Sequence, residues 1–303
     1  MSAAFEYTNK WTKILILITG LLVAMTANSY AQSLSVKMLN VGQGDAILIQ
    51  SDEQTVLIDT SDVDERNKLF YELHKAQIKK IDKLILTHSH ADHIGGAKPL
   101  IETYPIGEIY TDGTNRGNYN IYKGYQNAAK KRGIPIKTLT AGDVLSFGDD
   151  ITFEVFYPFE WLRVRYAAEK KYNNTSIVGK LTFKEFTMMF TGDAEADSEL
   201  AQLQAYPWDK FKSVVLKAPH HGSNTSSTDD YIKAVNPQYI FISAGSPGVD
   251  RGNVFGHPHK KSLDTYVKNG VKPENIFCTY KNGTITLNTD GTTFFVSAES
   301  HNG

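Results

Sequence analysis

The stretch Leu84-Ile-Leu-Thr-His-Ser-His-Ala-Asp-His-Ile-Gly-Gly96 decides how this chain is organised. Its apolar beginning, Leu84 to Leu86, predicts a buried strand. Side chains that can bind metal then crowd the next few positions: His88, His90, Asp92 and His93. Packing does not explain this concentration, because histidines repel one another when protonated and bury little apolar surface. Imidazoles with a carboxylate indicate a site for zinc or a similar first-row ion.

The histidine run matches the HxHxDH motif, and the chain therefore resembles the metallo-β-lactamase superfamily. Further matching pieces follow in order: Val41-Gly-Gln-Gly-Asp-Ala46, Leu57-Ile-Asp-Thr60, Asn173-Asn-Thr-Ser176, Thr191-Gly-Asp193, Pro219-His-His-Gly-Ser223 and Asn253-Val-Phe-Gly-His-Pro258. Together they resemble the hydrolase domain of bacterial DNA-uptake (competence) proteins and its stand-alone relatives. The resemblance implies an α/β (α+β) fold: an αββα four-layer sandwich in one domain, residues 32–303.

The N-terminal residues have the pattern of a secretory signal peptide. Lys10 and Lys13 precede an apolar run over residues 14–25, and residues 29–31 offer a small-x-small cleavage site. The run is shorter than the ~20 residues that span a bilayer comfortably. We therefore expect residues 1–31 to be removed and the protein to be exported, to the periplasm or the medium. An uncleaved N-terminal anchor is the alternative.

Composition limits the classes of function. Hydrophobic residues make up 41% and charged residues 21%, as in globular proteins. The formal net charge of −1 gives no overall field that recruits nucleic acid, so such binding needs a local patch. The strongest candidate is residues 158–174, where aromatic and basic side chains mix: Trp161, Arg163, Arg165, Lys170 and Lys171. This mixture suits nucleic acid, but composition favours an ordinary amphipathic insertion.

Strand patterns alternate with helical ones along the rest of the chain. We expect strands at 35–39, 46–50, 55–59, 83–86, 109–110, 136–139, 144–147, 151–156, 176–183, 187–191, 213–217, 239–243, 276–280, 284–288 and 293–297, and helices at 62–80, 94–104, 121–132 and 262–270. Asn282-Gly283 and Asp290-Gly291 predict hairpin turns between the last three strands. The lone Cys278 excludes an intramolecular disulfide and predicts a small core residue.

The metal-binding residues divide into two sets. His88 and His90 lie two positions apart and can bind one ion, whereas Asp92 and His93 can bind a second. The resemblance implies that Asp193 bridges the two, which a carboxylate can do because both of its oxygens carry free lone pairs. We expect two divalent ions, with zinc as the first choice.

The resemblance implies that the last ligand comes from the pair His220-His221. Adjacent residues on an extended segment point to opposite sides, so one should bind metal and the other should support it or touch substrate. We expect His221 to be the ligand, with His220 as the alternative. Many members of the superfamily also have a histidine ligand between the first motif and the bridging aspartate. This chain has none there and carries Asn173-Asn-Thr-Ser176, whose harder oxygens make manganese a competitor to zinc.

Other side chains of the motifs have supporting roles. Asp45 and Asp59 are expected to orient ligand histidines. Asp92 also positions the attacking water, and His257 protonates the leaving oxygen or binds a phosphate, unless it is an ordinary loop histidine. The remaining candidates lie behind the ligands or touch substrate: Asn174, Ser176, Ser223 and Asn253.

The expected function is an exported metal-dependent hydrolase, a phosphodiesterase of nuclease-like action, because two neighbouring ions suit phosphoester hydrolysis. Its substrate would be a small-molecule or nucleic-acid phosphodiester. The same fold also hydrolyses other bonds, so a phosphocholine ester, a lactam or a lactone is the alternative. A non-catalytic metal- or DNA-binding module would not need a bridging carboxylate beside two ligand sets. We expect no stable membrane partner after signal cleavage, and no motif indicates an oligomeric state.

N-terminal sequencing tests the prediction of export. Protein recovered from the periplasm or medium should begin at Gln32 or within a few residues of it, because signal peptidase cuts after small side chains. Recovery of the chain from the cytoplasm with Met1 still in place would contradict this prediction.

Overall fold

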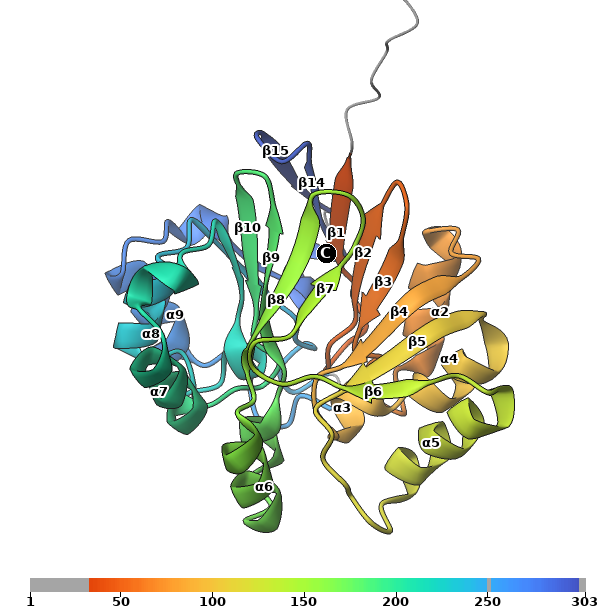
Figure 1. Cartoon of the computed structure of the whole chain (residues 1–303). Helices are drawn as coiled ribbons and strands as arrows, with labels where there is room; N and C mark the ends of the chain where they lie inside the picture. The colour runs from red at the N-terminus through yellow and green to blue at the C-terminus, as the bar shows by residue number, and fades with distance from the viewer. Residues whose placement is uncertain (1–32, 250–251, 300–303) are drawn as a thin grey trace, which may run out of the picture. The chain divides into compact units, whose positions relative to one another are not determined.

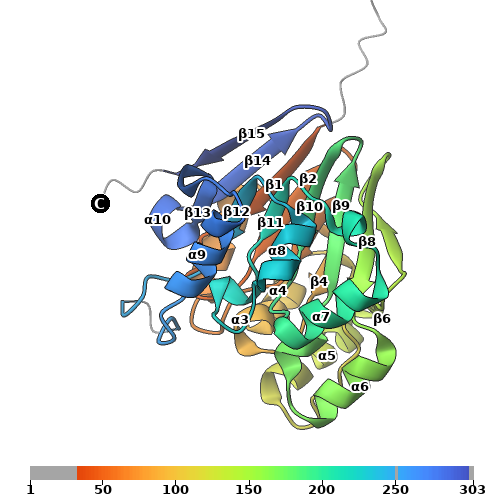
Figure 2. The same cartoon turned by 90° about the vertical axis from the view of Figure 1, so that its left-hand side faces the viewer.

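Two β-sheets pack face to face in the computed structural model, with helices on their outer faces (Figures 1 and 2). The structure describes residues 33–249 and 252–299, and the expected signal segment, residues 1–31, lies outside them. The layers confirm the predicted α/β class and the αββα sandwich. Within the described ranges, every helix is too short or too polar to cross a membrane.

The first sheet has eight strands in the order β15-β14-β1-β2-β3-β4-β5-β6. They are β1 (Leu34–Met38), β2 (Ile47–Ser51), β3 (Thr55–Ile58), β4 (Ile81–Leu86), β5 (Ile106–Thr111), β6 (Ile136–Thr138), β14 (Ile285–Thr289) and β15 (Phe294–Ala298). Strands β3 to β6 run parallel to one another. The predicted hairpin around Asp290-Gly291 is confirmed, since β14 pairs antiparallel with β15, and β2 and β3 form a second hairpin.

The second sheet has seven strands in the order β13-β12-β11-β10-β9-β8-β7. They are β7 (Val144–Ser146), β8 (Ile151–Tyr157), β9 (Val178–Phe183), β10 (Phe186–Phe190), β11 (Val215–Lys217), β12 (Tyr239–Ile242) and β13 (Ile276–Cys278). The predicted hairpin at Asn282-Gly283 is wrong. Strand β13 pairs with β12, whereas β14 belongs to the other sheet, so the chain crosses between sheets through the short helix α10 (Thr279–Asn282).

Helices cover both outer faces of the sandwich. The first sheet carries α2 (Arg66–Lys75), α4 (Ala97–Thr103) and α5 (Asn120–Arg132), and the second carries α6 (Glu160–Ala168), α7 (Ala196–Ala205), α8 (Asp229–Val235) and α9 (Lys260–Lys268). The predicted helix 62–80 is shorter than expected, and α6, α7 and α8 were not predicted. The helix expected over 94–104 is preceded by a separate turn of helix, α3 (Ala91–Ile94).

Apolar side chains fill the space between the sheets. The alternation in β1 directs Leu34, Val36 and Met38 into this core. Phe153 stacks on Phe147 there, with ring centroids 5.3 Å apart. Gly179 on the neighbouring strand makes room, since a Cβ at this position would lie 2.3 Å from the Phe153 ring.

The parallel strands determine where a site can form. In each sheet, side-by-side parallel strands present their carboxyl ends at the same edge, and ligands bind in the loops beyond such edges. The loops after β4, β10 and β11 come together near α3, at the lower edge in Figure 1. The HxHxDH motif lies in the first of these loops, because β4 ends at Leu86.

Replacing Phe153 with alanine should lower the free energy of unfolding by about 3–5 kcal/mol, because the surrounding core cannot close the cavity. Phe295→Ala is the matched control, since this ring is 67% exposed; its effect should stay within about 0.5 kcal/mol. Urea unfolding measures both. Equal losses in the two variants would contradict the assignment of the core.

Candidate metal centre

A close contact between α3 and the segment after β3 fixes the position of the histidine loop. A Cβ at Gly96 would lie 2.4 Å from the Thr60 carbonyl oxygen, and one at Gly95 would lie 2.3 Å from the Val63 nitrogen. The backbone amides of both glycines instead donate to the carbonyl oxygens of Thr60 and Ser61. Only glycine permits this approach, which holds α3 beside the carboxyl end of β3.

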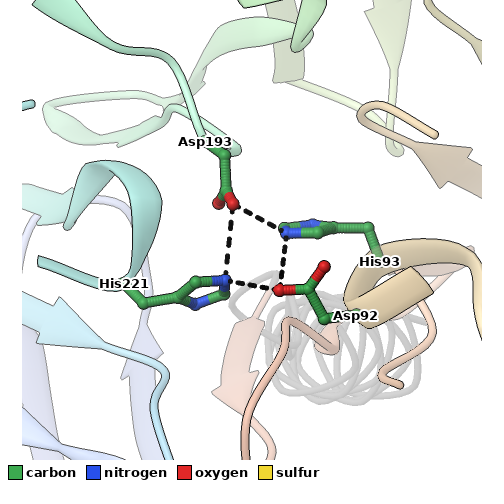
Figure 3. A group of neighbouring side chains, drawn as sticks. All are labelled: Asp92, His93, Asp193 and His221. Atoms are coloured by element: carbon green, nitrogen blue, oxygen red, sulfur yellow. Dashed lines mark ion pairs between the residues drawn. The ribbon is translucent and has the colours of Figure 1, made fainter. Parts of the chain in front are cut away.

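Four ligand-type side chains converge at this edge (Figure 3): Asp92, His93, Asp193 and His221. They come from α3, from the loop after β10 and from the short 3-10 turn η3 (Pro219–Gly222) after β11. One ligand atom from each lies within 4.8 Å of the others. His93 Nε2 is 3.2 Å from Asp193 Oδ2, and His221 Nε2 is 3.3 Å from Asp92 Oδ2 and 3.5 Å from Asp193 Oδ2.

Hydrogen bonds on the far side of both imidazoles leave the near nitrogens free. His221 Nδ1 lies 2.7 Å from the carbonyl oxygen of Ser243, which can only accept, so Nδ1 carries the proton. His93 Nδ1 donates to Asp59 at 2.7 Å. The Nε2 atoms of both rings are buried and have no hydrogen-bond partner in the described part of the chain. Two lone pairs thus point at a shared space, which fits a divalent cation.

The charge around these rings also fits a cation. Burial alone would lower the pKa of His93, but the carboxylates of Asp193 and Asp59 outweigh it and hold this pKa well above its usual range. The pKa of His221 is also held well above its usual range, because the carboxylates of Asp193 and Asp45 outweigh the effect of burial. The pKa values of both imidazoles are raised because the carboxylates around them are not fully neutralised by positive charge. A divalent ion would supply that positive charge.

His88 and His90 form a second pair beside this cluster. His88 Nε2 faces His90 Nδ1 at 3.1 Å, and the His88 ring centroid lies 4.1 Å from that of His93. Burial, together with the neighbouring imidazoles of His93 and His90, holds the pKa of His88 well below its usual range. Burial lowers the pKa of His90 too. Neutral rings keep their lone pairs, so this pair can accept a second ion.

The expectation that His220 and His221 alternate along an extended segment is wrong. Both residues have left-handed backbones, with φ of 47° and 53°, because the chain turns tightly in η3. Both rings consequently reach the same carboxylate: His220 Nε2 lies 3.8 Å from Asp193 Oδ2. His221 is buried within the four-residue cluster, whereas His220 lies at its open side.

The segment that replaces the missing histidine mainly supports the loop of Asp193. Ser176 Oγ accepts a hydrogen bond from the Asp193 amide at 3.0 Å. The Asn174 side chain accepts from the Glu195 amide and donates to the Glu195 carboxylate. Asn173 differs, because its Oδ1 is buried with no hydrogen-bond partner among the described residues and the side chain borders the cleft. Of this segment, Asn173 is thus the residue whose amide oxygen has no partner among the described residues and whose side chain borders the cleft.

A family model described as the metallo-beta-lactamase superfamily matches residues 39–245. The chain belongs to the metallo-β-lactamase superfamily. Among curated proteins, ComE operon protein 3 of Bacillus subtilis is 31% identical over 268 residues, which cover 82% of this chain and 32% of that protein. Competence protein ComA of Neisseria gonorrhoeae is 26% identical over 239 residues, 78% of this chain and 30% of that protein. The chain thus spans about a third of the length of these relatives.

A solved structure shows the same fold. The metallo-beta-lactamase fold protein YhfI of Bacillus subtilis superposes with a TM-score of 0.51 at 14% identity, covering 85% of this chain and all of that one. The comparisons confirm the resemblance to the superfamily and to competence proteins that the motifs predicted.

Two charged residues at the site of this metallo-β-lactamase domain were not predicted from the sequence. Lys217 is fully buried, with Nζ 2.6 Å from Asp45 and 2.9 Å from the Gly192 carbonyl oxygen. The Glu195 carboxylate accepts hydrogen bonds from Asn174 and Thr225, and it lies 3.3 Å from His220 Nδ1. Glu195 follows Asp193 by two positions, and this proximity to the motif is the feature of the sequence that could have indicated its role. Nothing in the sequence marks a lysine at a strand end as buried.

An open cleft of about 720 Å³ exposes the cluster. It is lined by His90, Ala91, Asp92, Tyr119, Asn173, Asp193, His220, Ser223, Asn224, Thr225, Phe255, His257 and His259. Burial, with His221 and His220 nearby, lowers the pKa of His257 to about 3, and its buried Nδ1 has no hydrogen-bond partner among the described residues. Asn253 holds the His257 backbone at both its amide and its carbonyl group.

The basic and aromatic segment 158–174 mostly lies elsewhere. Trp161 and Arg165 line a separate groove between α6 and α7. Arg165 and Lys171 pair with Glu169, and Arg163 donates to the Gly113 carbonyl oxygen. Of this segment, only Asn173 contributes to the cleft lining given above. Arg163, Arg165 and Lys171 are therefore engaged in local contacts.

Asp59→Ala should weaken metal binding by about 10–100-fold, because His93 loses the acceptor that fixes its proton and its ring. Competition with a chromogenic chelator measures the affinity. Asp59→Asn should lose less, since its amide oxygen still accepts from Nδ1. Asp64→Ala, on the exposed surface nearby, is the control. An affinity that is unchanged in a folded Asp59→Ala variant would contradict the assigned centre.

Proposed function

We propose that this chain is an exported, metal-dependent phosphodiesterase of nuclease-like action. The observation that carries the proposal is a cluster of ligand side chains around one carboxylate, with a second pair of histidines beside it. His93, His221 and Asp92 approach Asp193 inside the cluster, and the His88–His90 pair lies against His93. The N-terminal pattern of charge, apolar run and small residues supports export.

The residues fit two divalent ions, zinc or manganese. Such ions would polarise the phosphoryl oxygens and acidify a water molecule. The protein's own groups add orientation. Asp92 lines the cleft and keeps 24% of its side chain exposed, so its carboxylate can accept a hydrogen bond from the attacking water. Asp193 is buried and anchored by Ser176, which keeps its carboxylate between the ligand sets.

His257 is positioned to assist the leaving oxygen. Its ring lies at the wall of the cleft, with its centroid 5.3 Å from that of His220 and 6.0 Å from that of His221. Asn253 fixes the backbone, so the ring has a defined position. Because its pKa is low, the imidazole at this place is neutral and can donate a hydrogen bond to the ester oxygen, where negative charge develops as the P–O bond breaks.

The relatives favour DNA among the phosphodiesters. Two curated proteins that match most of this chain are named for competence or its operon. The shape of the cleft agrees with a chain-like substrate, since it is open and lined by groups from both halves of the sandwich.

A hydrolysis screen tests the proposal. Mature protein loaded with zinc or with manganese should cleave single-stranded DNA and small phosphodiesters, and chelation should abolish this activity. A chromogenic β-lactam should remain intact. Turnover of a β-lactam or a lactone without detectable phosphodiester cleavage would overturn the proposal, as would metal-loaded protein that cleaves none of these substrates.

The His257→Ala variant separates its role from that of the metal ligands. It should retain metal and fold but lose at least about 10²-fold in turnover of unactivated diesters, the usual cost of removing one hydrogen-bond donor to developing negative charge. The loss should be much smaller for nitrophenyl esters, because a good leaving group needs little such stabilisation. Losses that are equal for both substrate types would contradict the role.

A further inference from the structure

One large aromatic side chain stands exposed at the mouth of the cleft. Phe255 lines the cleft together with Asp92, Asp193 and His257, yet 68% of the residue is accessible to solvent. Its ring stacks on His257, with centroids 5.7 Å apart and planes inclined by 22°. One face of Phe255 is therefore covered by a cleft residue, while the rest of the ring remains available to a ligand.

Hydrogen bonds fix the backbone that carries this ring. The Asn253 side chain bonds to Gly245 and to both backbone groups of His257. His259 Nε2 donates to the Phe255 carbonyl oxygen, and His259 Nδ1 accepts from the Asn224 amide. The exposed ring is thus held in place before any ligand arrives, and binding it costs little ordering.

A second aromatic ring lines the cleft, and two cations contact residues of its lining. Tyr119 comes from the loop between β5 and α5, on the side of the first sheet, and the Arg116 guanidinium lies 4.6 Å from its ring centroid. Arg116 also donates to the Ser89 carbonyl oxygen in the histidine loop. On the side of the second sheet, Lys261 Nζ donates to the Asn224 carbonyl oxygen. These cations favour an anionic ligand.

We propose that Phe255 is a stacking platform for the base of a nucleotide whose phosphate lies at the metal centre. The inference rests on the proposed phosphodiesterase function and names the group next to the scissile phosphate. A flat ring held in a cleft beside cations suits a planar base on an anionic chain, and every base offers a π-face to it. A quaternary ammonium head group would also bind an aromatic ring, but Arg116 and Lys261, which contact the lining residues Tyr119 and Asn224, favour an anion over a cation in this cleft.

The test compares three p-nitrophenyl phosphodiesters that share one leaving group: the thymidine, methyl and choline esters. The wild type should show a lower KM for the thymidine ester than for the methyl ester. Phe255→Ala should raise the KM of the thymidine ester by about 5- to 150-fold, the effect of one lost base–aromatic stack, with kcat unchanged. The methyl ester should change less than twofold.

Two further variants control the comparison. Phe255→Tyr keeps a stacking face and should retain the low KM, whereas Val254→Ala removes a neighbouring side chain that is 77% exposed and should behave as wild type. Equal effects of Phe255→Ala on the thymidine and methyl esters, or a loss confined to the choline ester, would overturn the inference and leave the proposed function standing. Wild-type protein that hydrolyses none of the three esters would instead overturn the proposed function itself.

Discussion

Negative charge buried beside imidazoles is the constraint on which the rest of this structure depends. Asp45, Asp59 and Asp193 are buried at one edge of the sandwich. Lys217 compensates part of this charge, through Asp45 at 2.6 Å and Asp193 at 3.8 Å. His93 and His221 face the negative charge that Lys217 does not compensate. Their free Nε2 atoms face the carboxylates without hydrogen bonds, an arrangement that is costly without a cation. A cation bound here would thus stabilise the fold as well as supply the chemistry of the site.

The sandwich brings this charge together from distant parts of the sequence. Parallel strands in both sheets end at the same edge, so that the loops after β3, β4, β10 and β11 meet there. Asp59 and the histidine loop come from the first sheet, and Asp193 and His221 come from the second. Each sheet supplies half of the centre, and the core between the sheets holds the halves in register. The open side of the edge is then free for substrate, with Phe255 and Tyr119 at its mouth.

The sequence predicted those parts of the site whose residues lie close together along the chain. Asp92 and His93 share one helical turn, and the apolar strand before them is continuous, so both strand and ligands could be read directly. Asp193 and His221 were reached through motif order. Lys217 and Glu195 were missed because their roles arise only from tertiary contacts.

Helix α7 was missed for a similar reason. It buries Ser198, Glu199 and Gln202, whereas Leu200 is 56% exposed, so the apolar periodicity that marks a helix is absent. The buried Glu199 carboxylate accepts from the amides of Ser227 and Thr228, which explains why a polar face is turned inward. The left-handed turn at His220-His221 was likewise unpredictable, because neither residue is a glycine and only contacts with neighbouring loops impose it.

The most direct test of the metal centre is a crystal of the mature protein grown with manganese or zinc, with anomalous diffraction measured at the absorption edge of the metal. Two peaks about 3.5–4 Å apart are expected, one bounded by Asp92, His93 and His221 and the other beside His88 and His90, with Asp193 next to both. A single peak, or metal bound away from these side chains, would contradict the account.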